Sequence, residues 1–340
     1  MYNKILGCLV GAAAGDAMGA ATEARSSNQI IDTFGGKVTE FIKPPNDTFG
    51  AGNQAGGFTD DFSSAYFVAK EIVDNVGVVN EEIVQNALVE WSKHAVFFDR
   101  FAGPTTRLAI KRFAGEEVQL SEGIKNKARQ ATNGAAMRIS PIGLINAGDT
   151  ENAIKDAVIV ASVTHNNNLA ISGACAVAAA VSEAVRDGSN LYDVIDAGIY
   201  GANEGEKIGK ANGNNVAGPS VVKRIKMAVD IGFGTGSIDE RICNIADIIG
   251  TGLHVSETVP TAFGIIAACS GDSMRSISEA ASIGYDTDTI ATIVGGIVGA
   301  LNGYSSFPDY FISTMENVNK LDILGLANAI YDLQLGKEHQ

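Results

Sequence analysis

AISGACAVAAAVSEA, residues Ala170–Ala184, is apolar on nearly every face of the helix that it would form, and Glu183 is its one charged side chain. A helix without a polar face has to be buried among other elements. Small Ala and Gly side chains in such a helix let its neighbours approach closely. We therefore predict a central helix here, enclosed by further helices.

Outward from this segment, helical periodicity continues over nearly the whole chain, in about 14 segments. Asn80 can cap a helix with apolar positions at helical spacing. Ser237 with Glu240, and Ser276 with Glu279, have the spacing of capping boxes. Only residues 37–42 look strand-like, and weakly. The pattern predicts an all-α fold.

Composition narrows the class of protein. The chain has 340 residues, of which 46% are hydrophobic, so it can bury a large core; length alone would suggest two domains. A net charge of −14 without a basic run argues against a nucleic-acid partner. Four widely separated cysteines, with no C-x-x-C motif, fit reduced thiols and a cytoplasmic protein (Cys8, Cys175, Cys243 and Cys269).

Two apolar stretches raise the question of a membrane. Residues 5–14 resemble a signal peptide, but Asp16 follows at once and glycines interrupt the run, so we interpret them as a core helix. Residues 290–301 are too short to span a bilayer, which takes roughly 20 residues. We expect no membrane partner.

Two carboxylate clusters carry the candidate chemistry. Thr59-Asp60-Asp61 precedes one helical run, and Asp286-Thr287-Asp288-Thr289 precedes another. Helix capping is the simplest interpretation of either cluster alone, because Asp and Thr are preferred N-caps. Each cluster, however, has more acids than one cap can use. Four converging carboxylates would repel one another, and a hard cation such as Mg²⁺ or Mn²⁺ would neutralise them.

A third element is GAAAGDAMGAATE, residues 11–23. Gly11, Gly15 and Gly19 share one helix face, which is typical of closely packed helices. An ionised Asp16 in this apolar run needs partners. Glu23 lies just beyond the helix, where it could serve as an acid or base.

These motifs occur together, and in the same order, in a known family, which the chain resembles over residues 5–308. They are Gly11-x-x-x-Gly15-Asp16-Ala17-x-Gly19 with Glu23, Thr59-Asp60-Asp61, Asn133-Gly134-Ala135-Ala136-Met137-Arg138, Thr164-His165 and Asp286-Thr287-Asp288-Thr289 with Ile290, Gly295 and Gly299. The chain resembles the ADP-ribosylglycohydrolases, which include nitrogenase-reductase-activating glycohydrolases and the human ADP-ribosylserine hydrolase.

The resemblance implies a single domain over residues 1–340, folded as a compact multi-helix orthogonal bundle. It also implies a centre of two Mg²⁺ or Mn²⁺ ions, with Thr59, Asp60, Asp61, Asp286, Asp288 and Thr289 as ligands. Asn133, Gly134, Met137, Arg138 and His165 would then line the substrate pocket. From the residues alone, Met137 could equally fill the core, Arg138 could be an ion-pair partner and His165 a buried structural histidine.

The sequence departs from the family pattern at three places. Phe62 replaces the usual Thr after Thr-Asp-Asp, which leaves the ligands intact. Tyr285 replaces a Gly before Asp286, which predicts a ring beside the metal centre that narrows the pocket or stacks on a ligand. Residues 130–132 offer no aromatic side chain for stacking on adenine, which favours a compact ligand over ADP-ribose.

The function expected from these features is metal-dependent hydrolysis of an N- or O-glycosidic bond at ribose C1. Asp60 and Asp61 would hold and tune the metals, and Glu23 would act as acid or base. ADP-ribosylated protein is the family's default substrate. A small nucleoside or ribosyl metabolite is one alternative, and a non-enzymatic, crystallin-like or binding protein is another.

Overall fold

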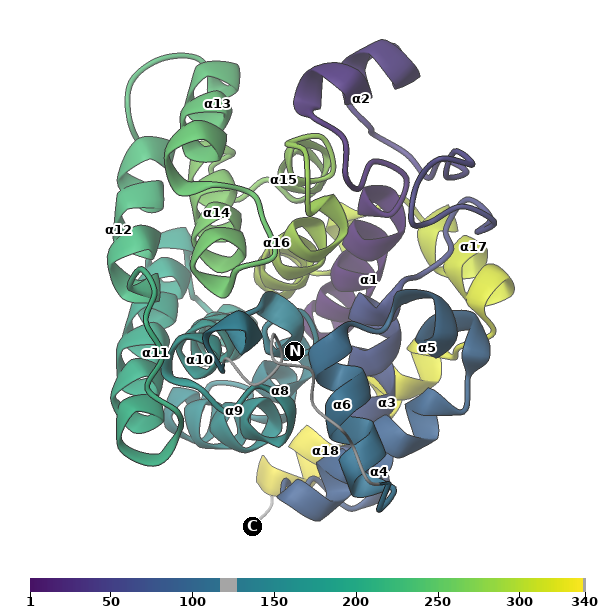
Figure 1. The fold of residues 1–340 in the computed structure, drawn as a ribbon, viewed down its shortest axis with the longest axis vertical. Helices are drawn as coiled ribbons and strands as arrows, with labels where there is room; N and C mark the ends of the chain where they lie inside the picture. The colour runs from purple at the N-terminus through teal and green to yellow at the C-terminus, as the bar shows by residue number, and fades with distance from the viewer. Residues whose placement is uncertain (117–126, 339–340) are drawn as a thin grey trace.

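The computed structural model describes residues 1–116 and 127–338, which contain seventeen α-helices and three short 3-10 helices but no strand. The all-α prediction is confirmed (Figure 1). The α-helices are α1 (Tyr2–Gly19), α2 (Ser27–Phe34), α3 (Asp60–Asp74), α4 (Glu81–Ser92), α5 (Ala95–Phe101), α6 (Pro104–Phe113), α8 (Ser140–Ile145), α9 (Thr150–His165), α10 (Asn168–Val185), α11 (Leu191–Asn212), α12 (Val221–Gly232), α13 (Ile238–Ile249), α14 (Val255–Ala268), α15 (Ser273–Ala280), α16 (Thr287–Asn302), α17 (Tyr310–Asn319) and α18 (Ile323–Glu338). The 3-10 helices are η1 (Lys127–Gln130), η2 (Asn133–Ala135) and η3 (Tyr304–Ser306).

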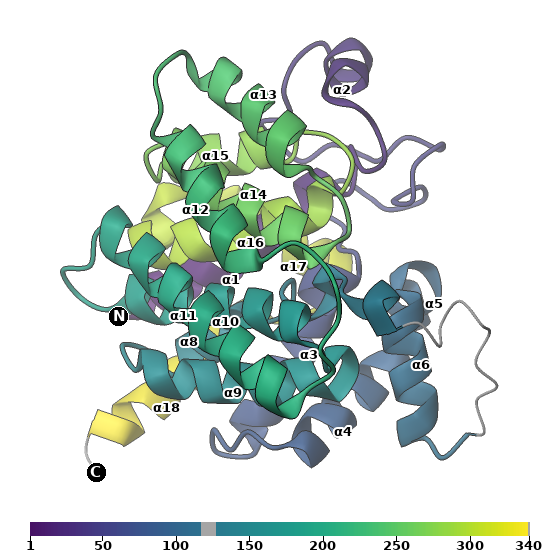
Figure 2. The same ribbon diagram turned by 60° about the vertical axis from the view of Figure 1, so that its left-hand side comes forward.

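Helix α10 is the central helix that the Ala-rich stretch predicts. It lies among α8, α9, α11, α14 and α16, as Figures 1 and 2 show from two directions. Within the described residues it is the one helix long and apolar enough to cross a membrane, but 94% of it is buried inside the protein. Its apolar surface therefore faces other helices.

Helices α1 and α16 run antiparallel along a row of glycines. A Cβ added to Gly11 would lie 2.1 Å from the carbonyl oxygen of Gly295, and one added to Gly15 would lie 2.0 Å from that of Ala291. At the end of the row, a Cβ on Gly19 would lie 2.4 Å from Cα of Asp288. The predicted close packing of this glycine face is confirmed, and it brings the end of α1 against the start of α16.

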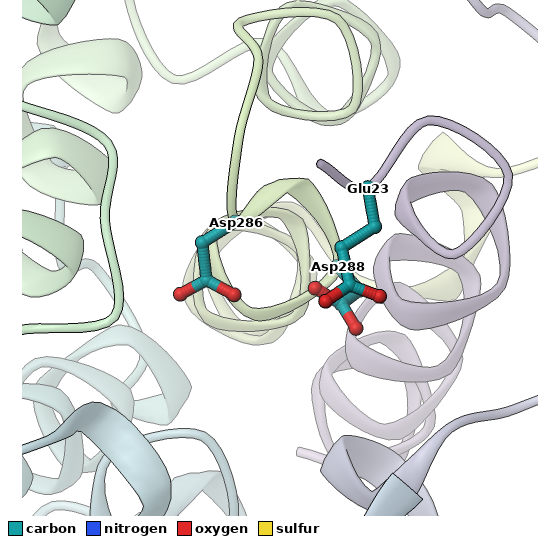
Figure 3. A group of neighbouring side chains, drawn as sticks. All are labelled: Glu23, Asp286 and Asp288. Atoms are coloured by element: carbon teal, nitrogen blue, oxygen red, sulfur yellow. The ribbon is translucent and has the colours of Figure 1, made fainter. Parts of the chain in front are cut away.

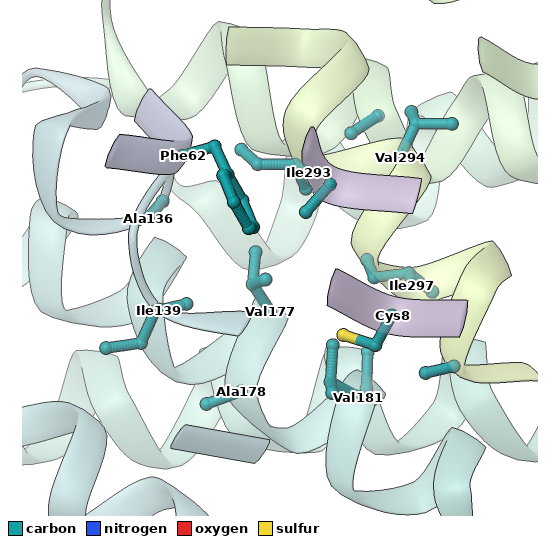
Figure 4. Packing of buried hydrophobic residues seen from close by; sticks show 14 of the residues in the cluster. Cys8, Phe62, Ala136, Ile139, Val177, Ala178, Val181, Ile293, Val294 and Ile297 are labelled. Atoms are coloured by element: carbon teal, nitrogen blue, oxygen red, sulfur yellow. The ribbon is translucent and has the colours of Figure 1, made fainter. Parts of the chain in front are cut away.

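The core surrounds this helix pair (Figure 4). Phe62 of α3 is 1% exposed and packs among side chains of α10 and α16, which include Val177 and Ile293. The ring also makes an edge contact with Phe58, with centroids 5.0 Å apart. Phe62 therefore fills the core directly behind the start of α3.

Of the helix caps and the strand predicted from the sequence, some are confirmed and others are wrong. Asn80 caps α4, and Ser237 forms its capping box with Glu240 on α13. The strand expected over residues 37–42 is wrong, because this segment forms no ladder. The second capping box is also wrong: Asp272 caps α15, Ser276 lies inside that helix, and the Glu279 carboxylate pairs with Lys37 instead.

Candidate metal centre

Three segments that are distant in the sequence meet at one cavity of about 460 Å³. The glycine contact between α1 and α16 places the loop after α1 beside the start of α16, and α3 begins at the same cavity. The acidic and hydroxyl residues that line it are Glu23, Asp60, Asp61, Asp286, Asp288 and Thr289. Thr59 does not line the cavity, but its hydroxyl lies 3.2 Å from the carboxylate of Asp61, which does. The two carboxylate clusters thus converge, as a shared site requires.

Glu23, Asp286 and Asp288 form the tightest part of the cluster (Figure 3). One carboxylate oxygen from each lies within 4.8 Å of the other two, and no other group of three or more His, Cys, Asp or Glu residues in the described chain meets this condition. Glu23, expected as an acid or base, is therefore also placed as a possible metal ligand.

Helix capping does not account for the acids of α16. Asp286 occupies the N-cap position, yet its side chain makes no capping bond. Its carboxylate instead accepts a short hydrogen bond from the Asn133 side-chain amide, which also donates to Thr258 Oγ1 at 2.9 Å. Asp288 Oδ1 accepts the backbone N–H of Thr289 at 3.0 Å. Both carboxylates keep further oxygen lone pairs for a cation.

At the start of α3, Thr59 caps the helix, whereas the neighbouring Asp61 has a carboxylate oxygen that accepts no hydrogen bond from the described residues. Thr59 is the N-cap, and its Oγ1 accepts the backbone N–H of Asp61 at 3.3 Å. Its hydroxyl lies 3.2 Å from Asp61 Oδ2. Asp61 is 2% exposed, and its Oδ1 is buried without a hydrogen-bond partner in the described structure. An orphaned buried carboxylate oxygen is costly unless a cation or donor satisfies it.

Asp16 has a role that the sequence left open. Its carboxylate is fully buried and accepts backbone N–H groups from Thr59 at 3.0 Å and Phe62 at 2.9 Å. Asp16 on α1 therefore caps α3 and orients the Thr59–Asp61 segment. The signal in the sequence was a lone acid inside an apolar Gly/Ala run, but its partners lie more than 40 positions away.

Burial and mutual repulsion perturb the acids of the cavity. Burial and Asp288 raise the pKa of Glu23 to about 10, that of Asp16 to about 8 and that of Asp60 to about 7. Burial also raises the pKa values of Asp61, Asp286 and Asp288. A group of buried carboxylates that repel one another is stabilised by a nearby positive charge. The side-chain atoms that these residues offer to a metal are all oxygens. The residues present therefore fit hard divalent cations such as Mg²⁺ or Mn²⁺.

Most of the expected substrate-binding residues line the same cavity as the acids, and Asn133 bonds directly to Asp286. Asn133, Gly134, Met137 and His165 all line it. Arg138 does not, because it is completely buried and donates to Thr106 Oγ1 at 3.1 Å and to Thr164 Oγ1 at 3.4 Å. Among the described residues no carboxylate forms an ion pair with it.

Tyr285 lies elsewhere than expected. Its ring is not part of the acidic cavity but lines a neighbouring one of about 730 Å³, and the residue is 54% exposed. Its backbone, with φ of 68°, pairs with the loop after α1: Tyr285 N–H donates to Arg25 O, and Ala24 N–H donates to Tyr285 O, both at 2.8 Å. We call this pairing the loop bridge. The residues of the loop bridge line the second cavity and not the acidic one, so the expectation that the ring narrows the acidic pocket is wrong.

Phe101 is an aromatic side chain of the cavity that the sequence did not reveal. It is the last residue of α5 and lines the acidic cavity, with the Arg100 guanidinium 4.6 Å from its ring centroid. Residues 130–132 supply no ring, so the aromatic surface comes from a different segment. No motif marks this position, because only the tertiary packing of α5 brings it to the cavity.

Comparison with known proteins is consistent with this geometry. The ADP-ribosylglycohydrolase family model matches residues 1–340, and the chain belongs to this family. The Escherichia coli (strain K12) protein YegU is 31% identical over 338 residues, covering 96% of each chain. Human ADP-ribosylhydrolase ARH3 is 24% identical, with 95% of this chain and 92% of the human protein covered. A solved structure described as an ADP-ribosylglycohydrolase-related protein complex has a TM-score of 0.67 at 21% identity, with 98% of both chains covered, which shows the shared fold.

Proposed function

We propose that the protein hydrolyses an N- or O-glycosidic bond at C1 of a ribosyl group and depends on two divalent metal ions. One observation carries the proposal: an oxygen-only set of carboxylates from three segments converges on one cavity, with Glu23, Asp286 and Asp288 within 4.8 Å. We extend the proposal to one domain over residues 1–340 in the cytoplasm, with no nucleic-acid partner.

The ligands that we propose for the metals are Thr59, Asp60, Asp61, Asp286, Asp288 and Thr289. A divalent pair there would supply the positive charge that binds vicinal ribose hydroxyls and orients a water. As the C1 bond breaks, positive charge develops on the sugar ring, and the carboxylates that line the cavity are suited to stabilise it. We propose that Glu23, which lines the cavity, gives a proton to the leaving group or takes one from the water that adds to C1.

Two substrate classes fit this chemistry. ADP-ribosylated protein is suggested by relatives such as human ADP-ribosylhydrolase ARH3 and the ADP-ribosylarginine hydrolase Tri1 of Pseudomonas putida, which is 24% identical. The missing ring at residues 130–132 favours a smaller nucleoside or ribosyl metabolite instead. Phe101 in the lining weakens that argument, so we propose the ADP-ribosyl substrate first.

The test measures ADP-ribose released from serine- and arginine-linked ADP-ribosylated peptides, beside ribose released from free nucleosides, in chelator-treated buffer with Mg²⁺ or Mn²⁺ restored. We expect turnover only with metal, and we expect Asp288→Asn to abolish it. Asp332→Asn, which removes an exposed carboxylate on α18, is the matched control and should keep wild-type activity. Equal turnover with and without metal, or by Asp288→Asn, would refute the proposal. Calorimetry with the metals alone separates an enzyme from a scaffold, because a scaffold need not bind them.

A further inference from the structure

A row of buried hydrogen bonds leads from Arg138 to the cavity. Arg138 Nη1 lies 3.4 Å from Thr164 Oγ1, which lies 2.7 Å from His165 Nδ1. On the other side of the imidazole, Nε2 lies 3.0 Å from Thr132 Oγ1. Arg138, Thr164 and His165 are at most 9% exposed, whereas Thr132 lines the cavity. We call these four side chains the relay.

The direction of each hydrogen bond follows from the chemistry of the first residue. A guanidinium can only donate, so Thr164 Oγ1 is an acceptor toward Arg138. The Thr164 hydroxyl has one hydrogen, and His165 Nδ1 is the acceptor that the structure offers it. If Nδ1 carried a hydrogen instead, the Thr164 hydrogen would be buried without an acceptor, which is costly. Thr164 therefore donates to Nδ1.

A neutral imidazole that accepts at Nδ1 carries its hydrogen on Nε2. Burial, with a smaller contribution from Arg138, lowers the pKa of His165 to about 3, so the ring is neutral. Nε2–H then donates to Thr132 Oγ1. The ring packs closely against Gly134, where an added Cβ would lie 2.8 Å from His165 Cε1. The hydrogen of the Thr132 hydroxyl is left for an acceptor in the cavity.

We propose that Arg138, Thr164 and His165 are positioning residues that fix the Thr132 hydroxyl as a hydrogen-bond donor to an oxygen of the bound ribosyl substrate. The carboxylates that line the cavity offer acceptors, whereas Thr132 would offer a donor, so the two would bind different groups of a ligand. The identity of the ligand rests on the proposed function, whereas the direction of the relay does not.

The direction of the relay is tested by ¹⁵N NMR of the imidazole nitrogens in the wild-type protein, with His165→Gln to assign the signals. We expect His165 to have a protonated Nε2 and an unprotonated Nδ1. Thr164→Val should shift the Nδ1 signal, because it removes the hydroxyl that donates to Nδ1. Thr164→Ser keeps a hydroxyl, so its Nδ1 signal should stay at the wild-type position. A protonated Nδ1 in the wild type would overturn the relay, whatever the enzyme does.

The contact with the ligand is tested by calorimetry with ADP-ribose in the presence of Mg²⁺. We expect Thr132→Val to weaken binding by about fivefold to tenfold, the effect of losing one hydrogen bond. Thr132→Ser keeps the hydroxyl and should bind ADP-ribose as tightly as the wild type does. In kinetic assays, Thr132→Val should raise KM and keep the wild-type kcat. Metal affinity measured without ADP-ribose should not change. Equal binding by the Val and Ser variants would overturn the contact.

A double-mutant cycle shows whether Thr164 acts through Thr132. We expect Thr164→Val to weaken ADP-ribose binding in the wild type but to add little in the Thr132→Val background. Additive losses would overturn the positioning role. If the wild type neither binds ADP-ribose nor cleaves a ribosyl glycoside, the proposed function fails, and the imidazole spectrum still decides the relay.

Discussion

Gly11→Ala tests whether the contact between α1 and α16 sets the geometry of the acid cluster. The added Cβ would lie 2.1 Å from Gly295 O, whereas real Cβ contacts essentially never fall below 3.0 Å. The obstacle is backbone, so no side-chain rotation can relieve it, and the helices must separate locally by about 1 Å. Overpacking of this kind costs about 1–3 kcal/mol, partly offset by up to about 1 kcal/mol from the better helix propensity of Ala.

The same displacement should reach the cavity, because Gly19 and Asp288 lie at the end of the same row of contacts. A misplacement of about 1 Å can cost about 100-fold in rate, so we expect kcat/KM to fall by about that factor. Urea unfolding gives the stability, and the peptide assay gives the rate. The matched control is Gly336→Ala in α18, where nothing lies within 4 Å and Ala should stabilise the protein by about 0.5–1 kcal/mol. A Gly11→Ala protein as stable and as active as the wild type would refute the reasoning.

Three further outcomes follow from the charges and the lining of the cavity. Mg²⁺ or Mn²⁺ at about 100 times Kd should stabilise the wild type by about 2.7 kcal/mol for each ion bound. Asp288→Asn should lose this gain, and without metal it should melt at a higher temperature than the wild type. A metal-induced Tm shift in Asp288→Asn as large as that of the wild type would contradict this. Burial raises the folded-state pKa values of Asp60 to about 7 and Asp16 to about 8. The stability that these groups contribute to the metal-free protein is therefore present at low pH and lost as pH rises through those values. Urea unfolding should give a lower free energy of unfolding at pH 9 than at pH 5, and a higher one at pH 9 would count against this prediction. Phe101→Ala should weaken ADP-ribose binding about 5- to 150-fold if the ring stacks on the base, with Phe101→Leu intermediate; no change in calorimetry would exclude stacking.

The helices and both acid clusters could be predicted from the sequence because their signals are local. The apolar run at residues 170–184 and the glycine spacing after Gly11 each correspond to one helix and one face. The clusters at Thr59–Asp61 and Asp286–Thr289 form the N-caps and first turns of α3 and α16, where short-range rules place them. Their convergence was expected from the resemblance, and residues of both clusters line the cavity.

The remaining features depend on contacts between distant segments or on single backbone angles. Tyr285 lines the second cavity and has a φ of 68°, which no sequence rule assigns to a tyrosine. Asp16 caps a helix that begins at Asp60, and Phe101 reaches the cavity only through the packing of α5. Ser276 with Glu279 has the spacing of a capping box, but the ion pair with Lys37 takes the carboxylate away.

Backbone contacts between neighbouring segments, rather than bonds between the carboxylates themselves, hold the acids of the cavity close together. The backbone of Gly19 meets that of Asp288, and the loop bridge ties the residue after Glu23 to the residue before Asp286. Hydrogen bonds within the protein account for only part of these acids: Asp286 accepts a bond from Asn133 but makes no capping bond, and Asp61 Oδ1 has no partner in the described chain. The fold thus brings acids together against their repulsion and leaves acceptor oxygens unused. That arrangement is expected of a preorganised cation site, in which the metal contributes to the stability of the fold as well as to its chemistry.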